Sequence, residues 1–173
     1  MSDEEDASPL RGSDARFQRR RAELALELRA LLGPRAAAEP MADADRAATI
    51  AADVGAAHRE ARPHPWAMVR HAWSSSERVA VVALLHAVSA SVGARAAWLV
   101  VPGREPQVVS IASDAVLDNP LGFAAIAGGE LVLADQAVPA GLWLHATHDG
   151  WDLEAWGAEP WLSATTRAIR EAG

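Results

Sequence analysis

The chain has 173 residues, half of them apolar, with 23 acidic against 16 basic side chains and a formal charge of −7. This length and apolar content suffice for one domain with a buried core and an additional N-terminal part. The acidic balance argues against broad binding of nucleic-acid phosphates, which requires a basic surface. Cysteine is absent from the sequence, which excludes disulfides, thiol nucleophiles and thiolate metal sites.

The N-terminal sequence, MSDEEDASPL, is acidic where a signal peptide would be basic and then apolar. No apolar run reaches the length of a membrane span. We therefore expect a cytoplasmic protein without a membrane partner. Acidic residues mixed with Ser, Pro and Gly predict a disordered acidic tail over residues 1–14.

Residues 15–73 are expected to form a helical segment in front of the domain. A first helix from Ala15 to Leu32 is predicted by four apolar residues at helical spacing: Phe17, Leu24, Leu28 and Leu31. The arginines near its start could form a nucleic-acid arm, but such a run is more commonly a solvated helix face. The leucine stripe could pack on the domain or on a second copy of the chain, which would give a homodimer.

A second helix is expected to begin at Asp43 or Asp45 and to end near Arg62. Its apolar stripe is thin and rich in alanine, so it needs a partner surface. Three apolar residues beyond it have the spacing of one helical face and predict an apolar plug for docking: Trp66, Val69 and Trp73. Because such helices bury little area, we expect residues 1–62 to serve association rather than the integrity of the domain.

Residues 74–173 have the pattern of an α+β domain. Ser74 and Glu77 have capping-box spacing and begin a helix that runs to about Val92. Five strands are expected, over residues 96–101, 107–112 and 130–134 and in the two halves of a hairpin over 141–157. A short helix after the second strand and a last helix after Pro160 give the order helix-β-β-helix-β-β-β-helix. Tight turns predict a five-stranded, mostly antiparallel sheet packed by helices.

The hairpin over residues 141–157 is the clearest local pattern. The dipeptide Asp149-Gly150 favours a two-residue type I′ turn with positive φ at Gly150. The register that follows places Trp143 opposite Trp156. A slip of one residue would mix the apolar and polar faces, so turn chemistry and patterning agree.

In the same register His145 lies opposite Glu154, on the face that also carries Asp152. The candidate binding surface therefore consists of five residues: Trp143, His145, Asp152, Glu154 and Trp156. If no other element covers this face, two indoles with a charged rim have the composition of a binding hot spot. Covered by the protein's own helices, the same tryptophans would be core.

Motifs of common enzymes are absent, including GxGxxG, the P-loop, GxSxG and HExxH. Glu154 could orient His145 as a general base, but no nucleophile or oxyanion donor accompanies this pair. His145 and His148 are three residues apart on a strand and face opposite sides, so they do not predict a metal site. We expect no cofactor.

Three functions remain, and the first is preferred. It is a small, acidic, non-catalytic protein-binding domain of the adaptor, inhibitor, chaperone or immunity type, acting through the tryptophan-rich sheet face and the N-terminal helices. The element order is also similar to the loose architecture of PAS, GAF and profilin-like domains, without any motif of those families, and this likeness implies a small-ligand sensor. The third is a hydrolase-like enzyme using His145 and Glu154. A pocket lined by tryptophans would favour the sensor, an open tryptophan patch the protein binder, and a cleft around His145 the enzyme.

Overall fold

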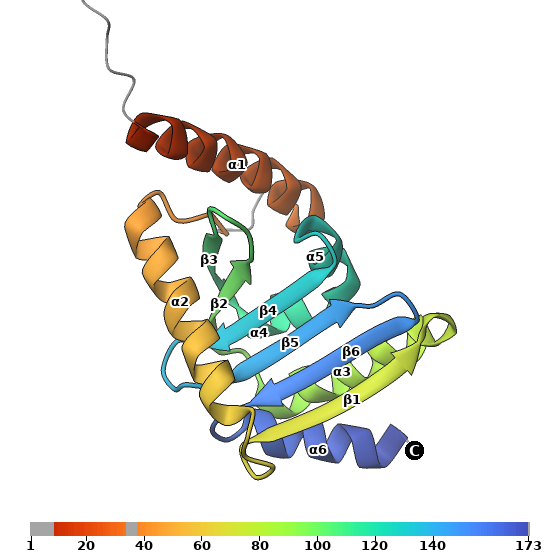
Figure 1. The fold of residues 1–173 in the computed structure, drawn as a ribbon. Helices are drawn as coiled ribbons and strands as arrows, with labels where there is room; N and C mark the ends of the chain where they lie inside the picture. The colour runs from red at the N-terminus through yellow and green to blue at the C-terminus, as the bar shows by residue number, and fades with distance from the viewer. Residues whose placement is uncertain (1–8, 34–37, 173) are drawn as a thin grey trace, which may run out of the picture.

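The computed structural model describes residues 9–33 and 38–172 (Figure 1). Within them the chain is α+β, with six α-helices and a six-stranded sheet. The helices are α1 Pro9–Leu32, α2 Ala44–Ala61, α3 Arg78–Val92, α4 Ser113–Leu117, α5 Pro120–Ile126 and α6 Trp161–Ala172. The strands are β1 Met68–Ser74, β2 Ala96–Val101, β3 Gln107–Ala112, β4 Glu130–Asp135, β5 Gly141–Ala146 and β6 Gly150–Trp156. A 3₁₀ turn, η1 Ser75–Glu77, joins β1 to α3.

The sheet has the strand order β1-β6-β5-β4-β2-β3, and each neighbouring pair is antiparallel. The α+β class and the strands β2 to β6 are confirmed, but the predicted number of five strands is wrong. The additional strand is β1, which we expected to be a helical plug. Val69 and Trp73 belong to the core on one face of the sheet and Met68 to the core on the other, so side chains alternate as in a strand. Pairing with β6 decides the structure of this short segment, because its spacing also fits a helix.

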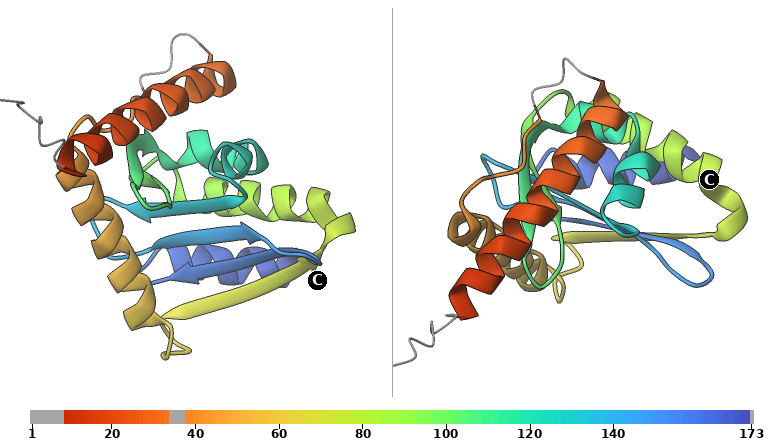
Figure 2. Two further views of the ribbon diagram at one scale, coloured as in Figure 1. Left: turned by 45° about the horizontal axis from the view of Figure 1, so that its top comes forward. Right: turned by 90° about the horizontal axis from the view of Figure 1, so that it is seen from above.

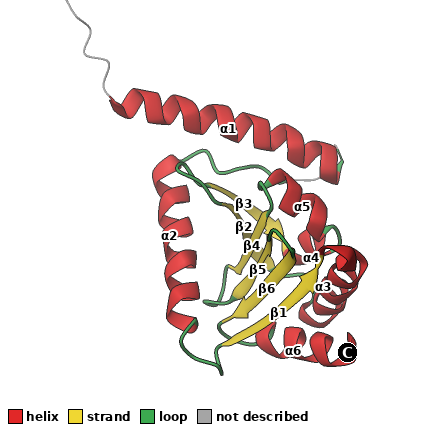
Figure 3. Ribbon diagram, turned by 45° about the vertical axis from the view of Figure 1, so that its right-hand side comes forward, coloured by secondary structure: helices red, strands yellow, loops and turns green. Residues whose placement is uncertain are grey.

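The helices cover the two faces of the sheet unequally (Figure 3). On one face α3, α4, α5 and α6 enclose the larger core, whereas α2 covers the opposite face. Leu85, Leu133 and Phe123 are among the fully buried side chains of the larger core. No helix in the described residues has both the length and the apolar character needed to cross a bilayer.

The N-terminal helices are part of this core. Leu24 and Leu28 of α1 are buried in the larger core, and Phe17 of α1 and Ala47 of α2 are buried in the core beneath α2. Arg16 also binds Glu105 in the β2–β3 loop, with 2.8 Å between Nε and Oε1. This burial argues against the expectation that residues 1–62 serve association rather than the integrity of the domain. Of the leucines that could pack on the domain or on a second copy, Leu24 and Leu28 are buried inside their own chain and Leu31 is partly buried there.

The first helix begins earlier than we predicted. α1 starts at Pro9, so residues 9–14 of the predicted acidic tail are helical. Residues 1–8 of that tail lie outside the described residues.

The β5–β6 hairpin has a different register from the predicted one. Trp143 pairs with Glu154 instead of Trp156, and His145 pairs with Asp152 instead of Glu154. The backbone N–H of Thr147 donates to the carbonyl of Gly150 at 2.8 Å, which leaves His148 and Asp149 as the loop. The shift is two residues, so each side chain keeps its predicted face.

Gly150 does not have the positive φ angle that we predicted. It pairs with Ser74 of β1, and a Cβ atom at this position would overlap the backbone carbonyl of Trp73. Glycine is therefore required by the close approach of β1. This constraint is absent from the local turn sequence, which explains the wrong register.

Candidate functional site

The candidate site lies beneath α2, where this helix crosses the sheet (Figures 1 and 2). Asp43 caps the helix as predicted, since its carboxylate accepts a hydrogen bond of 3.0 Å from the backbone N–H of Arg46. The α2 residues that belong to the core against the sheet are mostly alanines: Ala44, Ala47, Ile50, Ala51, Val54 and Ala61. Small side chains cannot fill the space between a helix and a sheet, and a cavity remains on each flank of α2.

The first cavity, which we call the His58 cavity, has a volume of about 320 Å³. It is lined by alanines and a glycine of α2, by apolar residues of the sheet and the β2–β3 loop, and by one ionisable side chain: Ala48, Ala51, Ala52, Val54, Gly55, His58, Val100, Pro102, Gly103, Pro106, Val132, Trp143 and Trp156. This volume is at the lower end of the range typical for small-molecule sites. The cavity is therefore apolar, with an aromatic wall and few polar groups.

The second cavity, the Asp53 cavity, has a volume of about 290 Å³ and lies on the other flank of α2. Its lining combines α2 with the chain between β4 and β5: Ile50, Asp53, Val54, Ala57, Trp98, Trp156 and residues 134–140. Val54 and Trp156 line both cavities. The two spaces are separated by these side chains, and Trp156 is the aromatic residue common to both.

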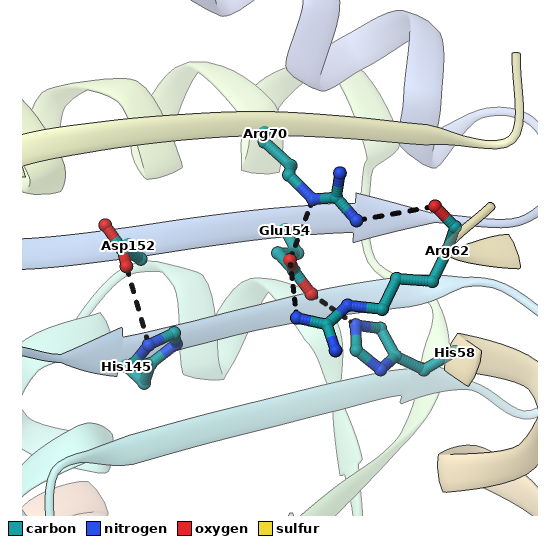
Figure 4. Close-up of polar contacts among 6 residues, drawn as sticks. All are labelled: His58, Arg62, Arg70, His145, Asp152 and Glu154. Carbon is teal, nitrogen blue, oxygen red and sulfur yellow. Dashed lines mark hydrogen bonds and ion pairs between the residues drawn. The ribbon is translucent and has the colours of Figure 1, made fainter. Parts of the chain in front are cut away.

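A polar cluster anchors the C-terminal half of α2 to the sheet (Figure 4). His58 Nε2 lies 2.5 Å from Oε2 of Glu154 on β6, and the Nε of Arg70 on β1 donates to Oε1 of the same carboxylate at 2.9 Å. Arg62, just beyond α2, lies 3.7 Å from that oxygen. Glu154 thus joins one helix and two strands through charged hydrogen bonds, which are stronger than neutral ones.

Opposing effects act on the Glu154 carboxylate. Burial raises its pKa, but the hydrogen bonds from Arg70 and His58 and the charge of Arg62 outweigh burial and hold the pKa below its ordinary value. The carboxylate is therefore ionised near neutral pH. Its negative charge is compensated by the groups that bind it, which is the condition for keeping a carboxylate in a largely buried position.

Two aromatic rings surround His58, which is 4% exposed. The centroid of its imidazole lies 4.6 Å from that of Trp143 and 5.1 Å from that of Trp156. The indole Nε1 of Trp143 is buried and has no hydrogen-bond partner in the described chain. A buried donor without a partner costs about 1–3 kcal/mol. The indole of Trp143 therefore lines the His58 cavity, and its unpartnered N–H is shielded from solvent in the unliganded chain.

The five predicted site residues fall into two groups. Trp143, Glu154 and Trp156 lie together with His58 beneath α2, and Trp156 is only 1% exposed. His145 and Asp152 lie farther along the hairpin and face each other, with 3.6 Å between Nε2 and Oδ2 (Figure 4). The predicted pair of His145 and Glu154 is therefore wrong, because Glu154 binds a histidine of α2.

Sequence reasoning missed His58, Arg62 and Arg70. The carboxylate and His58 are separated by 96 positions in the chain, so their contact has no local signal. The helical period could have indicated His58, since it follows Val54 by four residues on the apolar stripe of α2. A histidine on such a stripe is a buried polar group that needs a partner.

The site has few groups for catalysis. Among the described residues that line the two cavities there is no serine, threonine or cysteine to act as a nucleophile. Within the same described chain, no three side chains of the metal-ligating types are grouped for a metal ion. His58 and Glu154 have the geometry of an oriented base, but this arrangement also explains the attachment of α2. The arrangement is best suited to binding an apolar molecule.

Comparison with known proteins adds no identification. No family model, no curated protein and no solved structure matches the chain.

Proposed function

We propose that this protein is a non-catalytic binding domain that holds a small ligand in the His58 cavity, between α2 and the sheet. The observation that carries the proposal is the cavity of about 320 Å³ with an aromatic wall and an unused buried donor on Trp143. Apolar pockets with a few convergent polar groups are the usual form of small-molecule sites. This function corresponds to the small-ligand sensor that the element order implies.

The lining also indicates the class of ligand. The lining combines two indoles with the alanine-rich side of α2, which suits a largely apolar molecule with an aromatic ring. The N–H of Trp143 is shielded from solvent, so a ligand uses it only if the ring turns toward the cavity on binding; the ligand should then carry an acceptor such as a carbonyl oxygen or a ring nitrogen. Such an acceptor would remove the cost of the unpartnered indole N–H.

The other two functions have less support. The tryptophan face that we assigned to a protein partner lies beneath α2, so a protein could reach Trp156 only after α2 had moved. The enzyme was proposed on His145 and Glu154, which are not paired. Neither cavity has a hydroxyl or thiol nucleophile among its described lining residues.

The proposal can be tested with two probes of similar shape, 2-acetylnaphthalene, which has a carbonyl acceptor, and 2-ethylnaphthalene, which has none. Quenching of tryptophan fluorescence and calorimetric titration would measure their affinities. We expect the ketone to bind more tightly by roughly three- to tenfold, the value of one hydrogen bond. In Trp143→Phe this preference should disappear.

Ala51→Leu provides the steric test, because its larger side chain projects into the His58 cavity and should abolish binding of both probes. Trp151→Phe is the matched control, since Trp151 packs against the core on the opposite face and its loss should leave both affinities unchanged. Absence of binding by either probe, or binding that Ala51→Leu does not reduce, would contradict the proposal.

A further inference from the structure

A groove on the opposite side of the sheet from α2 is independent of the His58 cavity. It has a volume of about 470 Å³ and runs between the start of β1 and helix α6. Trp66, Val69 and Leu162 supply its apolar surface. Trp66 is 76% exposed, far more than a tryptophan with a purely structural role, and exposed aromatic residues are characteristic of the centres of protein interfaces.

The charges around this groove are mainly positive. Arg167 and Arg170 of α6 line it, and neither forms an ion pair with a carboxylate of the described chain. One acidic residue, Glu159, also lines the groove. Its carboxylate already accepts hydrogen bonds from the backbone N–H and the hydroxyl of Ser163. In a protein with a formal charge of −7, a groove with two unpaired arginines selects an acidic occupant.

The groove adjoins an unpaired edge of the sheet. β1 is the last strand on its side, and its outer edge pairs with no other strand in the described chain (Figure 2). Such an edge presents free backbone N–H and C=O groups to an incoming strand. An added strand gains affinity from the backbone hydrogen bonds and specificity from a neighbouring pocket for its side chains.

We propose that the β1 edge and its groove bind an extended segment of a partner protein in which the side chains at every second position are apolar or acidic. The backbone of the segment pairs with β1, an apolar side chain packs on Trp66 and Leu162, and its carboxylates pair with Arg167 and Arg170. Every second side chain of a strand points to the same face, so these apolar and acidic side chains all lie on the groove side of the added strand.

The β1 strand of a second copy does not have the required chemistry. The charged and titratable side chains of β1 are Arg70 and His71, and the strand has no carboxylate. Antiparallel pairing of two β1 strands would bring basic groups together, which is unfavourable for opposed residues. The acidic requirement therefore points to a different protein.

The test is selection from a displayed library of random seven-residue peptides, the length of β1, with the full-length protein as bait. The selected peptides should have an apolar residue and Asp or Glu at positions two residues apart. Trp66→Ala, and separately Arg167→Glu with Arg170→Glu, should weaken their binding by about tenfold or more. Amide hydrogen exchange should slow in β1 when the peptide binds.

Val79→Ser is the control for Trp66→Ala, because Val79 is an equally exposed apolar residue on α3. The exposed pair Arg46→Glu with Arg104→Glu is the control for charge. Both controls should bind like the wild type. The proposal is overturned if no peptide is enriched, if the enriched peptides lack acidic residues, or if the Trp66 and arginine variants bind them normally. Sedimentation that shows a dimer abolished by Trp66→Ala would identify a second copy as the occupant and also overturn it.

Discussion

The two faces of the sheet are built from the same strands but are packed differently. The face covered by α3 to α6 is filled by large side chains such as Leu85, Leu133 and Phe123. The face covered by α2 contacts mainly alanines of that helix, and two cavities of about 290 and 320 Å³ remain there. We infer that the side-chain volume of the covering helix decides whether a face of the sheet becomes a filled core or keeps cavities.

Each face also holds one carboxylate with charged partners, Asp135, which is buried, and Glu154, which is partly buried. Asp135 of β4 belongs to the packed face, where it accepts hydrogen bonds from the indole Nε1 of Trp161 at 3.0 Å and from the guanidinium of Arg95. Glu154 belongs to the α2 face and binds His58 and Arg70. On the packed face the carboxylate fixes α6 to the sheet, whereas on the α2 face it fixes the helix that closes the cavities.

The largest effect should come from deleting residues 1–62, which removes the cover of the α2 face together with Leu24 and Leu28 of the larger core. We expect loss of cooperative unfolding and of the near-ultraviolet circular dichroism of the tryptophans. The truncated chain would then be unable to fold by itself. A truncated protein with native-like near-ultraviolet signal would mean that the α2 face contributes little to the fold.

Removing large side chains should separate the two faces. Leu85→Ala, on the packed face, should lower the free energy of unfolding by about 2–5 kcal/mol because it creates a new cavity. Ile50→Ala, on the α2 face, should cost about 1 kcal/mol, because Ile50 already borders a cavity and is only half-buried. Urea unfolding of both variants measures the difference. Equal losses would contradict unequal packing.

Adding volume should have the opposite pattern. Ala97→Leu on the packed face should cost about 1–3 kcal/mol through overpacking, because Ala97 is fully buried. Ala51→Leu on the α2 face should change stability by less than about 1 kcal/mol, since the His58 cavity can accept the side chain. The same urea titrations report both values, and a loss for Ala51→Leu as large as that for Ala97→Leu would show that no space is available.

The two carboxylates should give a smaller, pH-dependent difference. For Asp135, burial raises the pKa, but the hydrogen bonds from Arg95, Trp161 and the backbone N–H of Ala137 together outweigh burial. The pKa of Asp135 in the folded state is therefore below its ordinary value, as is that of Glu154. Depressed pKa values mean that both contributions are present above the unfolded-state values of about 4 and are lost as the pH falls through the folded-state values.

Asp135→Asn and Glu154→Gln should therefore each flatten the acid side of the stability profile. Near neutral pH the cost should be about 3 kcal/mol for Asp135→Asn, whose side chain is almost fully buried, and about 1 kcal/mol for Glu154→Gln. Unfolding titrations from about pH 3 to about pH 7 measure both profiles. If the free energy of unfolding of Glu154→Gln fell as steeply with acid as that of the wild type, Glu154 would not contribute to the pH dependence.

The sequence predicts the parts of the fold that depend on local patterns. β2 and β3 have the predicted bounds, and the cap at Asp43 places the start of α2, because alternation and capping are encoded by neighbouring residues. β1 was missed, since the spacing of Trp66, Val69 and Trp73 fits a helix, and pairing with β6 decides between the two.

The candidate site was harder to predict, because its contacts join distant parts of the chain. The shared face of Trp143 and Trp156 follows from strand alternation, which a two-residue shift of register leaves unchanged. The partner of Glu154 could not be found in this way, since His58 lies 96 positions away on another element. The cavities themselves depend on how far α2 stands from the sheet, and no local pattern specifies that distance.

The most direct test of the proposed ligand site is the indole N–H resonance of Trp143 in a ¹H–¹⁵N spectrum, assigned by its disappearance in Trp143→Phe. If the α2 face is a binding space, titration with 2-acetylnaphthalene should shift this resonance downfield as the N–H gains an acceptor. The resonances of Trp66 and Trp151, which lie outside the His58 cavity, should stay in place. The proposed ligand site would be contradicted if the Trp143 resonance did not move while the probe bound elsewhere, or if the protein did not bind the probe.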